Sequence, residues 1–156
     1  IYHWNKAMSQ AYTLAINELY KALGLDQPNE VEEVISLQVG EMICHLTEHP
    51  ADSLLMFSSL GAVTDFDVSL LLNNNMFSQE LQKPEVAIDE TSGNVILWNR
   101  QPLLNAYGQS LYRQLELLSQ ACDRLTGVES ANTALAVEAS SETQSQSEFS
   151  PTSFRV

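Results

Sequence analysis

Basic residues are scarce in this chain of 156 residues. It has seven Lys and Arg against twenty Asp and Glu, which gives a formal net charge of -13. The seven cations also stand singly along the sequence rather than in clusters. Proteins that bind nucleic acid or anionic lipid need clustered cations to neutralise phosphate groups. We therefore expect neither a nucleic-acid partner nor a membrane partner.

Cysteine and long apolar runs are scarce as well. Cys44 and Cys122 both lie in apolar patterns, and two cysteines do not make a disulfide framework in a chain of this length, which favours a reducing compartment. No stretch approaches the roughly 18 apolar residues that a membrane span needs. Residues 1–25 carry polar groups at helical intervals instead of the apolar block of a signal peptide. We expect a soluble protein of the cytoplasm.

Motifs for common catalytic chemistry are missing too. The chain has no Gly-x-Ser-x-Gly and no Gly-rich phosphate loop among its six glycines. Cys44, His45 and His49 are the one suggestive metal constellation, but neighbouring strand residues point to opposite faces, and His49 precedes Pro50 in a loop. We therefore expect no metal, no cofactor and no enzymatic activity. An enzyme that uses His45 or His49 ranks last among the hypotheses.

The hydrophobic pattern predicts short helices and strands. Apolar residues recur every three or four positions from Met8 to Leu23 and again after Asn105, which is typical of amphipathic helices. Alternation with a period of two indicates strands. The predicted segments are helix 8–23, strands 34–39, 42–47 and 53–60, helix 66–72, strands 85–89 and 94–100, and a last helix from residue 105 to 125.

The predicted order is α-β-β-β-α-β-β-α. Strands that are grouped favour an α+β fold with an antiparallel sheet of about five strands over a parallel sheet. After Thr126 the composition changes to Ser, Thr, Gln, Ala and Glu, with too little apolar surface to offset the entropy of ordering. We expect one folded domain over residues 1–126 and a flexible tail over 127–156.

Two of the predicted elements leave apolar surface to be covered. Helix 66–72 is apolar almost all round, and such a helix needs burial on more than one side. The sheet has a second face beyond the one that the two longer helices cover, and Ile43, Leu55, Phe57 and Trp98 have a parity that could place them there. This pattern favours self-association through helix 66–72.

Several short motifs in this order of elements resemble those of a known family. They are Leu71-Leu72-x-x-Asn75 at the end of the second helix, and Gly93-x-Val95-x-Leu97 followed by Gln101-Pro102-Leu103 before the last helix. Together with the acidic charge and the chain length, they resemble the class I type III secretion chaperones, the Tir-chaperone (CesT-like) family, over roughly residues 7–126.

The resemblance implies a homodimeric chaperone without enzymatic activity, located in the bacterial cytoplasm. It would bind the N-terminal region of one or more secreted effector proteins, keep that region soluble and export-competent, and release it to the secretion apparatus and its ATPase. The dimer interface that the resemblance implies comprises Phe66, Val68, Leu70, Leu71, Leu72, Val95 and Leu97. For effector binding, through apolar patches or strand addition at a sheet edge, we expect contributions from Ile35, Leu37, Ile43, Leu55, Phe57 and Trp98.

One alternative of a different class stays open at this point. A small-ligand or regulatory α+β domain could use the exposed face of the sheet as its pocket.

The negative charge is consistent with the chaperone hypothesis. Residues 127–156 hold four Glu and one Arg, so a net charge of -10 belongs to the folded part. Such a field would keep a dimer with apolar patches from self-associating further, and would favour neutral or basic effector segments.

Overall fold

The computed structural model describes residues 8–127 and 137–139. Its elements follow the predicted order over the folded part and confirm the α+β class. The helices are α1 (Gln10–Ala22), α2 (Val68–Asn74) and α3 (Gly108–Thr126), with a 3-10 turn η1 (Val63–Asp65) before α2. The strands are β1 (Val34–Val39), β2 (Met42–Glu48), β3 (Ser53–Ala62), β4 (Glu85–Ile88), β5 (Asn94–Pro102) and β6 (Val137–Ala139).

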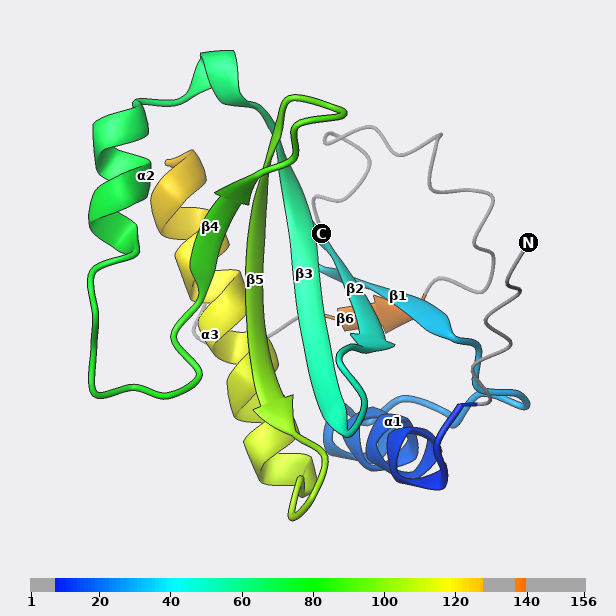
Figure 1. Ribbon diagram of the computed structural model, residues 1–156. Helices are drawn as coiled ribbons and strands as arrows, with labels where there is room; N and C mark the ends of the chain where they lie inside the picture. The colour runs from blue at the N-terminus through cyan, green and yellow to red at the C-terminus, as the bar shows by residue number, and fades with distance from the viewer. Residues whose placement is uncertain (1–7, 128–136, 140–156) are drawn as a thin grey trace, which may run out of the picture.

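The strands form one antiparallel sheet in the order β4-β5-β3-β2-β1-β6. The tight hairpin at Gly40-Glu41 is confirmed, since Val39 pairs with Met42 and Gly40 takes a φ of +60°, which suits glycine. Helix α3 runs behind β3, β4 and β5, and α1 lies across the end of the same layer (Figure 1). Among the residues that the structure describes, no helix packs on the opposite face of β3 and β5 (Figure 1).

The core lies between the sheet and the two longer helices. Every second strand residue points into it, as the period of two predicted. Its fully buried side chains include Leu37, Leu46, Leu54, Met56 and Leu97 from the strands and Tyr12, Ile16, Leu19, Leu111, Leu115 and Leu118 from the helices. Leu46 pairs with Met56 and Leu37 with Cys44, whereas Leu54, Met56 and Leu97 also lie beside the buried polar residues Gln101, Asn99 and Ser58 of neighbouring strands.

A buried amide network fixes α3 on the sheet. Gln114 is fully buried, and its Nε2 donates to the backbone oxygens of Leu54 at 3.2 Å and of Asn99 at 3.3 Å. Its Oε1 accepts from Gln101 Nε2 at 2.6 Å. Asn99 Nδ2 donates in turn to the backbone oxygen of Gln114 at 2.8 Å. Because buried polar groups need partners, this network sets the register of α3 against β3 and β5.

The ends of α2 agree only in part with the prediction. The helix begins two residues later than predicted, because Asp67 is its N-cap and accepts a hydrogen bond from the backbone N–H of Ser69 at 2.9 Å. Thr64 lies in the 3-10 turn before it. The three asparagines end the helix as expected, with Asn75 at its C-cap.

The sheet has one strand more than the sequence predicted. Strand β6 comes from residues 137–139 and pairs antiparallel with β1 at Leu37, Gln38 and Val39. The prediction of a flexible tail over 127–156 otherwise concerns residues that lie, apart from Gly127, outside the described part of the chain.

Candidate functional site

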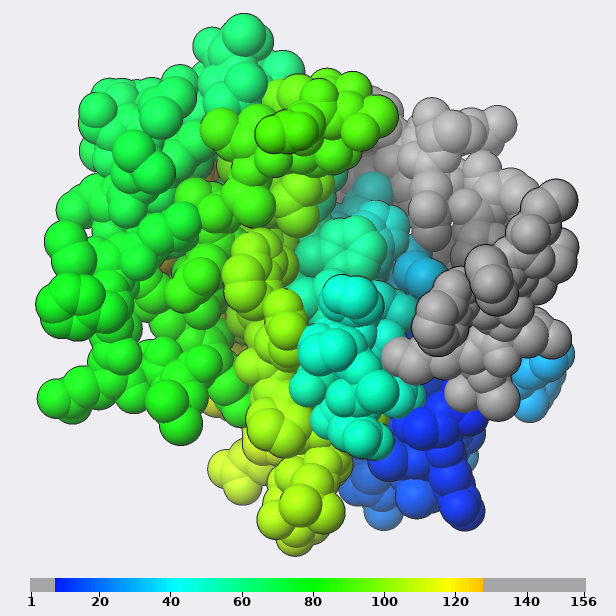
Figure 2. All heavy atoms as spheres, viewed as in Figure 1, coloured from blue at the N-terminus to red at the C-terminus, as the bar shows by residue number. Residues whose placement is uncertain are grey.

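A row of side chains crosses the helix-free face of the sheet, and all of them are partly exposed except the buried Ser36. Register places Ser36, His45, Phe57, Trp98 and Glu85 side by side on β1, β2, β3, β5 and β4. The His45 and Phe57 rings lie 5.1 Å apart, and Ser36 Oγ lies 2.8 Å from His45 Nδ1. Side chains of β3 and β5 form the middle of the surface seen in Figure 2. The row gives this face an aromatic centre.

Four of the predicted effector-binding residues lie on this face. Phe57 and Trp98 belong to the row itself, and Ile43 and Leu55 flank it on β2 and β3. All four are partly exposed. The guanidinium of Arg100 lies 5.1 Å from the centre of the Trp98 ring, in a cation–π contact at the border of the patch. We call these four residues, with His45, the sheet-face patch.

The other two predicted effector-binding residues lie on the helix-covered face of the sheet. Ile35 is 7% exposed and Leu37 is fully buried, and both pack in the core beneath the helices. The parity of β1 decides this, because its apolar residues pair with Leu46 and Cys44 of β2, which also face the helices. Their prediction as surface binding residues is therefore corrected, and they support the patch only from below.

Burial controls the chemistry of the titratable groups near the patch. Desolvation lowers the pKa of His45, so its imidazole is neutral at pH 7. On the opposite face, burial raises the pKa of the Cys44 thiol and raises that of Cys122 to about 12. Both thiols are therefore protonated and poorly nucleophilic. Within residues 8–127 and 137–139, no three His, Cys, Asp or Glu side chains are grouped as metal ligands.

A second apolar surface surrounds α2. It is formed by side chains of α2, of the segment 75–84 and of β4, at the edge of the sheet where Figure 1 shows α2. Leu70 and Leu72 are 64% and 66% exposed, and Phe77 and Leu81 are 91% and 95% exposed. We call this the α2 surface; its exposed apolar residues are Val68, Leu70, Leu72, Met76, Phe77, Leu81 and Ile88.

The predicted interface residues divide between this surface and the interior. Val68, Leu70 and Leu72 belong to the α2 surface, and Phe66 is partly exposed just before the helix. Leu71 is buried and holds the helix in place. Val95 and Leu97 are fully buried on the helix-covered face of β5, so their prediction as interface contacts is corrected.

The segment 75–84 was the main surface feature that the sequence analysis missed. Its three large apolar residues, Met76, Phe77 and Leu81, show no regular period and so gave no signal for a helix or strand. Polar contacts still fix the ends of the segment. Lys83 Nζ donates to the backbone oxygens of Met76 and Asn74, and Asn74 Nδ2 donates to the oxygen of Pro84 at 3.2 Å.

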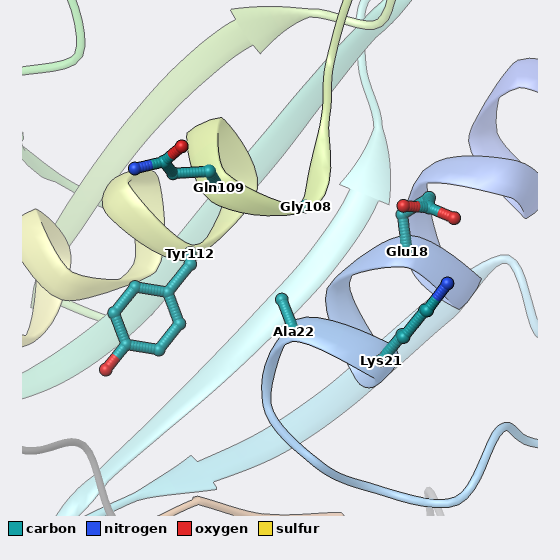
Figure 3. Close-up of a pocket in the computed structure, with 6 residues that line it drawn as sticks. All are labelled: Glu18, Lys21, Ala22, Gly108, Gln109 and Tyr112. Carbon is teal, nitrogen blue, oxygen red and sulfur yellow. The ribbon is translucent and has the colours of Figure 1, made fainter.

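A cavity of about 550 Å³ lies where the end of α1 meets the start of α3 (Figure 3). A side chain at Gly108 would meet the backbone oxygen of Glu18 at 3.3 Å, so glycine permits this close approach of the two helices. The lining mixes charged, polar and aromatic groups from Glu18, Lys21, Ala22, Gly108, Gln109 and Tyr112. This cavity lies between helices and not on the sheet face that the small-ligand hypothesis named.

Of the helices in the described residues, none combines the length and the apolar character that crossing a bilayer requires.

Comparison with known proteins assigns the chain to a family. The model of the Tir chaperone protein (CesT) family matches residues 15–126. The YopE regulator of Yersinia enterocolitica is 44% identical over 115 residues, which are 74% of this chain and 88% of that protein. The YopE regulator of Yersinia pestis is 43% identical over the same shares.

Two solved structures also resemble this chain. The chain resembles one in the ExoT–SpcS complex from Pseudomonas aeruginosa, with 42% identity, a TM-score of 0.67, and coverage of 76% of this chain and 99% of that one. The Yersinia pestis type III secretion chaperone SycH, solved with a fragment of YscM2, shares the fold at 21% identity and a TM-score of 0.62, over 73% and 98% of the two chains. The chain therefore belongs to the Tir chaperone (CesT) family of class I type III secretion chaperones.

Proposed function

We propose that this chain acts as a homodimeric, non-enzymatic type III secretion chaperone in the bacterial cytoplasm. It binds the N-terminal region of one or more secreted effector proteins and keeps that region soluble and export-competent. The observation that carries this proposal is the sheet-face patch, a half-exposed aromatic and aliphatic surface on a rigid sheet. Its relative SpcS forms a complex with ExoT, which supports the same role here.

The sheet-face patch suits an extended, disordered partner. Such a segment can lay spaced apolar side chains on Phe57 and Trp98 while its backbone stays accessible. Ordering the segment costs free energy on binding, so the complex holds the effector without locking it irreversibly. Release then requires a competing interaction, which we assign to the secretion apparatus and its ATPase.

The α2 surface suits a second copy of the chain. A monomer rarely exposes so many large apolar side chains on one side. Leu70 and Leu72 project from a rigid helix, while Phe77 and Leu81 stand on the neighbouring segment. Self-association through α2 would cover both groups together, and would leave the sheet-face patch free for the effector.

The charge of the chain supports this division of surfaces. A dimer would double the net charge of -13 on each chain. Mutual repulsion at that charge keeps dimers with exposed apolar patches apart. The same negative field favours the binding of neutral or basic segments over acidic ones.

A small-ligand or regulatory domain is the second candidate, and the cavity between α1 and α3 is the observation that favours it. Its lining includes the charged side chains of Glu18 and Lys21, which can bind polar groups of a ligand (Figure 3). The two functions differ in a simple assay. A ligand-binding domain should show a thermal shift with a small-molecule library, whereas a chaperone should protect a bound peptide from protease.

Purification of the full chain from its native host tests the proposed function. A secreted protein should co-purify, and limited proteolysis should leave its N-terminal region protected. If no secreted protein co-purifies, or if the protected region lies elsewhere, the proposal is wrong.

A further inference from the structure

In the part of the sheet formed by residues 34–102, the two outermost strands are β4 and β1, and each meets another segment of the chain along its outer side. An edge strand presents unpaired backbone N–H and C=O groups and so accepts further strands. At β4, the side-chain amide of Asn75 bonds to both the N–H and the C=O of Val86. At β1, strand β6 pairs with Leu37, Gln38 and Val39 through Ala139, Glu138 and Val137. The β4 edge is therefore met by a side chain, whereas the β1 edge holds a true strand.

Strand β6 lies outside the part of the chain that matches the family. The family model ends at residue 126, and β6 begins eleven residues later in sequence numbering. The strand thus lies outside the matched region and extends the sheet that residues 34–102 form.

We propose that residues 137–139 occupy the outer side of β1 in cis, and that an extended effector segment must displace them before it can pair there. This proposal rests on the proposed function, and adds a control of the same binding surface. Ser36 and Gln38 of β1 belong to the helix-free face, so a strand added at this edge continues the sheet next to the patch.

The size of β6 fits a displaceable occupant. It has three residues and three pairs to β1, at the short end of the range for strands. The pairing of β6 with β1 is favoured because β6 is covalently linked to α3. This link gives such a segment an effective concentration on the order of millimolar. A longer effector strand that also places side chains on the sheet-face patch makes more contacts and can displace β6 from β1.

Hydrogen exchange of the full chain tests whether β6 covers β1. The variant Glu138→Pro removes a backbone N–H and disfavours the strand, while Thr143→Pro is a matched control four residues past β6. We expect the amides of β1 to exchange faster in Glu138→Pro than in the wild type and in Thr143→Pro. Amides of β3 and β5 should be unchanged in all three proteins. Equal exchange in β1 would overturn the proposal.

A labelled peptide that copies residues 132–142 tests the competition itself and requires no effector. Its affinity for Glu138→Pro should exceed its affinity for the wild type and for Thr143→Pro by about tenfold, because the tethered copy no longer competes. Equal affinities would overturn the proposal, even if β1 exchange differs. These measurements are independent of effector co-purification, so their failure and a failure of the proposed function can be told apart.

Discussion

The side chain of Asn75 pairs with the backbone of Val86 as a neighbouring strand would. Its Nδ2 donates to the oxygen of Val86 at 2.9 Å, and its Oδ1 accepts from the N–H of Val86 at 2.7 Å. Residue 75 is the C-cap of α2, so the pair ties the end of that helix to the edge of β4. This amide therefore ties the α2 surface to β4, beside the contacts that Asn74 and Lys83 make.

Replacing this amide should loosen the whole α2 surface. Asn75→Ala removes two partly buried hydrogen bonds and should lower the free energy of unfolding by about 1–2 kcal/mol. Asn73→Ala, two positions away on the exposed side of the same helix, should change it by less than about 0.5 kcal/mol. Urea denaturation measures both. Equal effects of the two substitutions would refute this role for Asn75.

Gln114 should be the most sensitive polar residue of α3. Gln114→Ala leaves a cavity and takes a partner from Gln101 and from two backbone oxygens, so we expect a loss of about 2–4 kcal/mol in stability. Gln120→Ala, on the exposed side of the same helix, is the matched control and should be nearly neutral. Chemical denaturation measures the stability of both variants. If Gln114→Ala leaves the stability unchanged, the amide network does not stabilise the position of α3.

His45 should make stability depend on pH. Burial lowers the pKa of the folded imidazole, so unfolding takes up a proton as pH falls below about 6.5. The contribution of neutral His45 is complete above that value and is lost as pH falls through it toward the folded pKa. Between pH 7.5 and 5.5, the free energy of unfolding should therefore fall more for the wild type than for His45→Gln.

The exposed His49 supplies the control for this measurement. His49→Gln keeps His45, and should retain the extra loss of stability seen in the wild type. If His45→Gln loses as much stability over this pH range as the wild type does, burial of the imidazole does not govern its titration.

The α2 surface should determine the oligomeric state. Light scattering on the full chain should give about twice the 17.3 kDa of one chain. The double variant Leu70→Asp with Leu72→Asp places two charges on this surface and should be monomeric. Leu104→Asp changes a leucine that is even more exposed but lies just before α3, and this variant should remain dimeric. A monomeric wild type, or a dimeric double variant, would exclude α2 from the interface.

The sequence predicted the elements well because their signals are local. Alternation in Val34–Val39 and heptad-like spacing in α3 are read from a few neighbours, and both elements were found where expected. The face that each strand buries is not local, because it depends on where the helices pack. Ile35 and Leu37 were therefore placed on the wrong face, although their alternation was read correctly.

Side-chain to backbone contacts were beyond the sequence for the same reason. Asn75 was identified as a helix terminator, which it is, but its pairing with Val86 joins residues eleven apart across a segment without a period. Strand β6 pairs with β1 nearly a hundred residues away in number, so a composition typical of a flexible tail gave no sign of it. The aromatic row from His45 to Trp98 likewise needed the register of three strands.

Effector capture by a patch variant tests the central claim most directly. Full-length wild type, the double variant Phe57→Ala with Trp98→Ala, and the exposed control Leu104→Ala should be purified in parallel from the native host, with co-purifying proteins quantified by mass spectrometry. The account predicts that a secreted protein accompanies the wild type and Leu104→Ala, and falls at least about tenfold with the double variant, as the loss of two aromatic anchors implies. Equal recovery with all three proteins, or no secreted protein with the wild type, would contradict it.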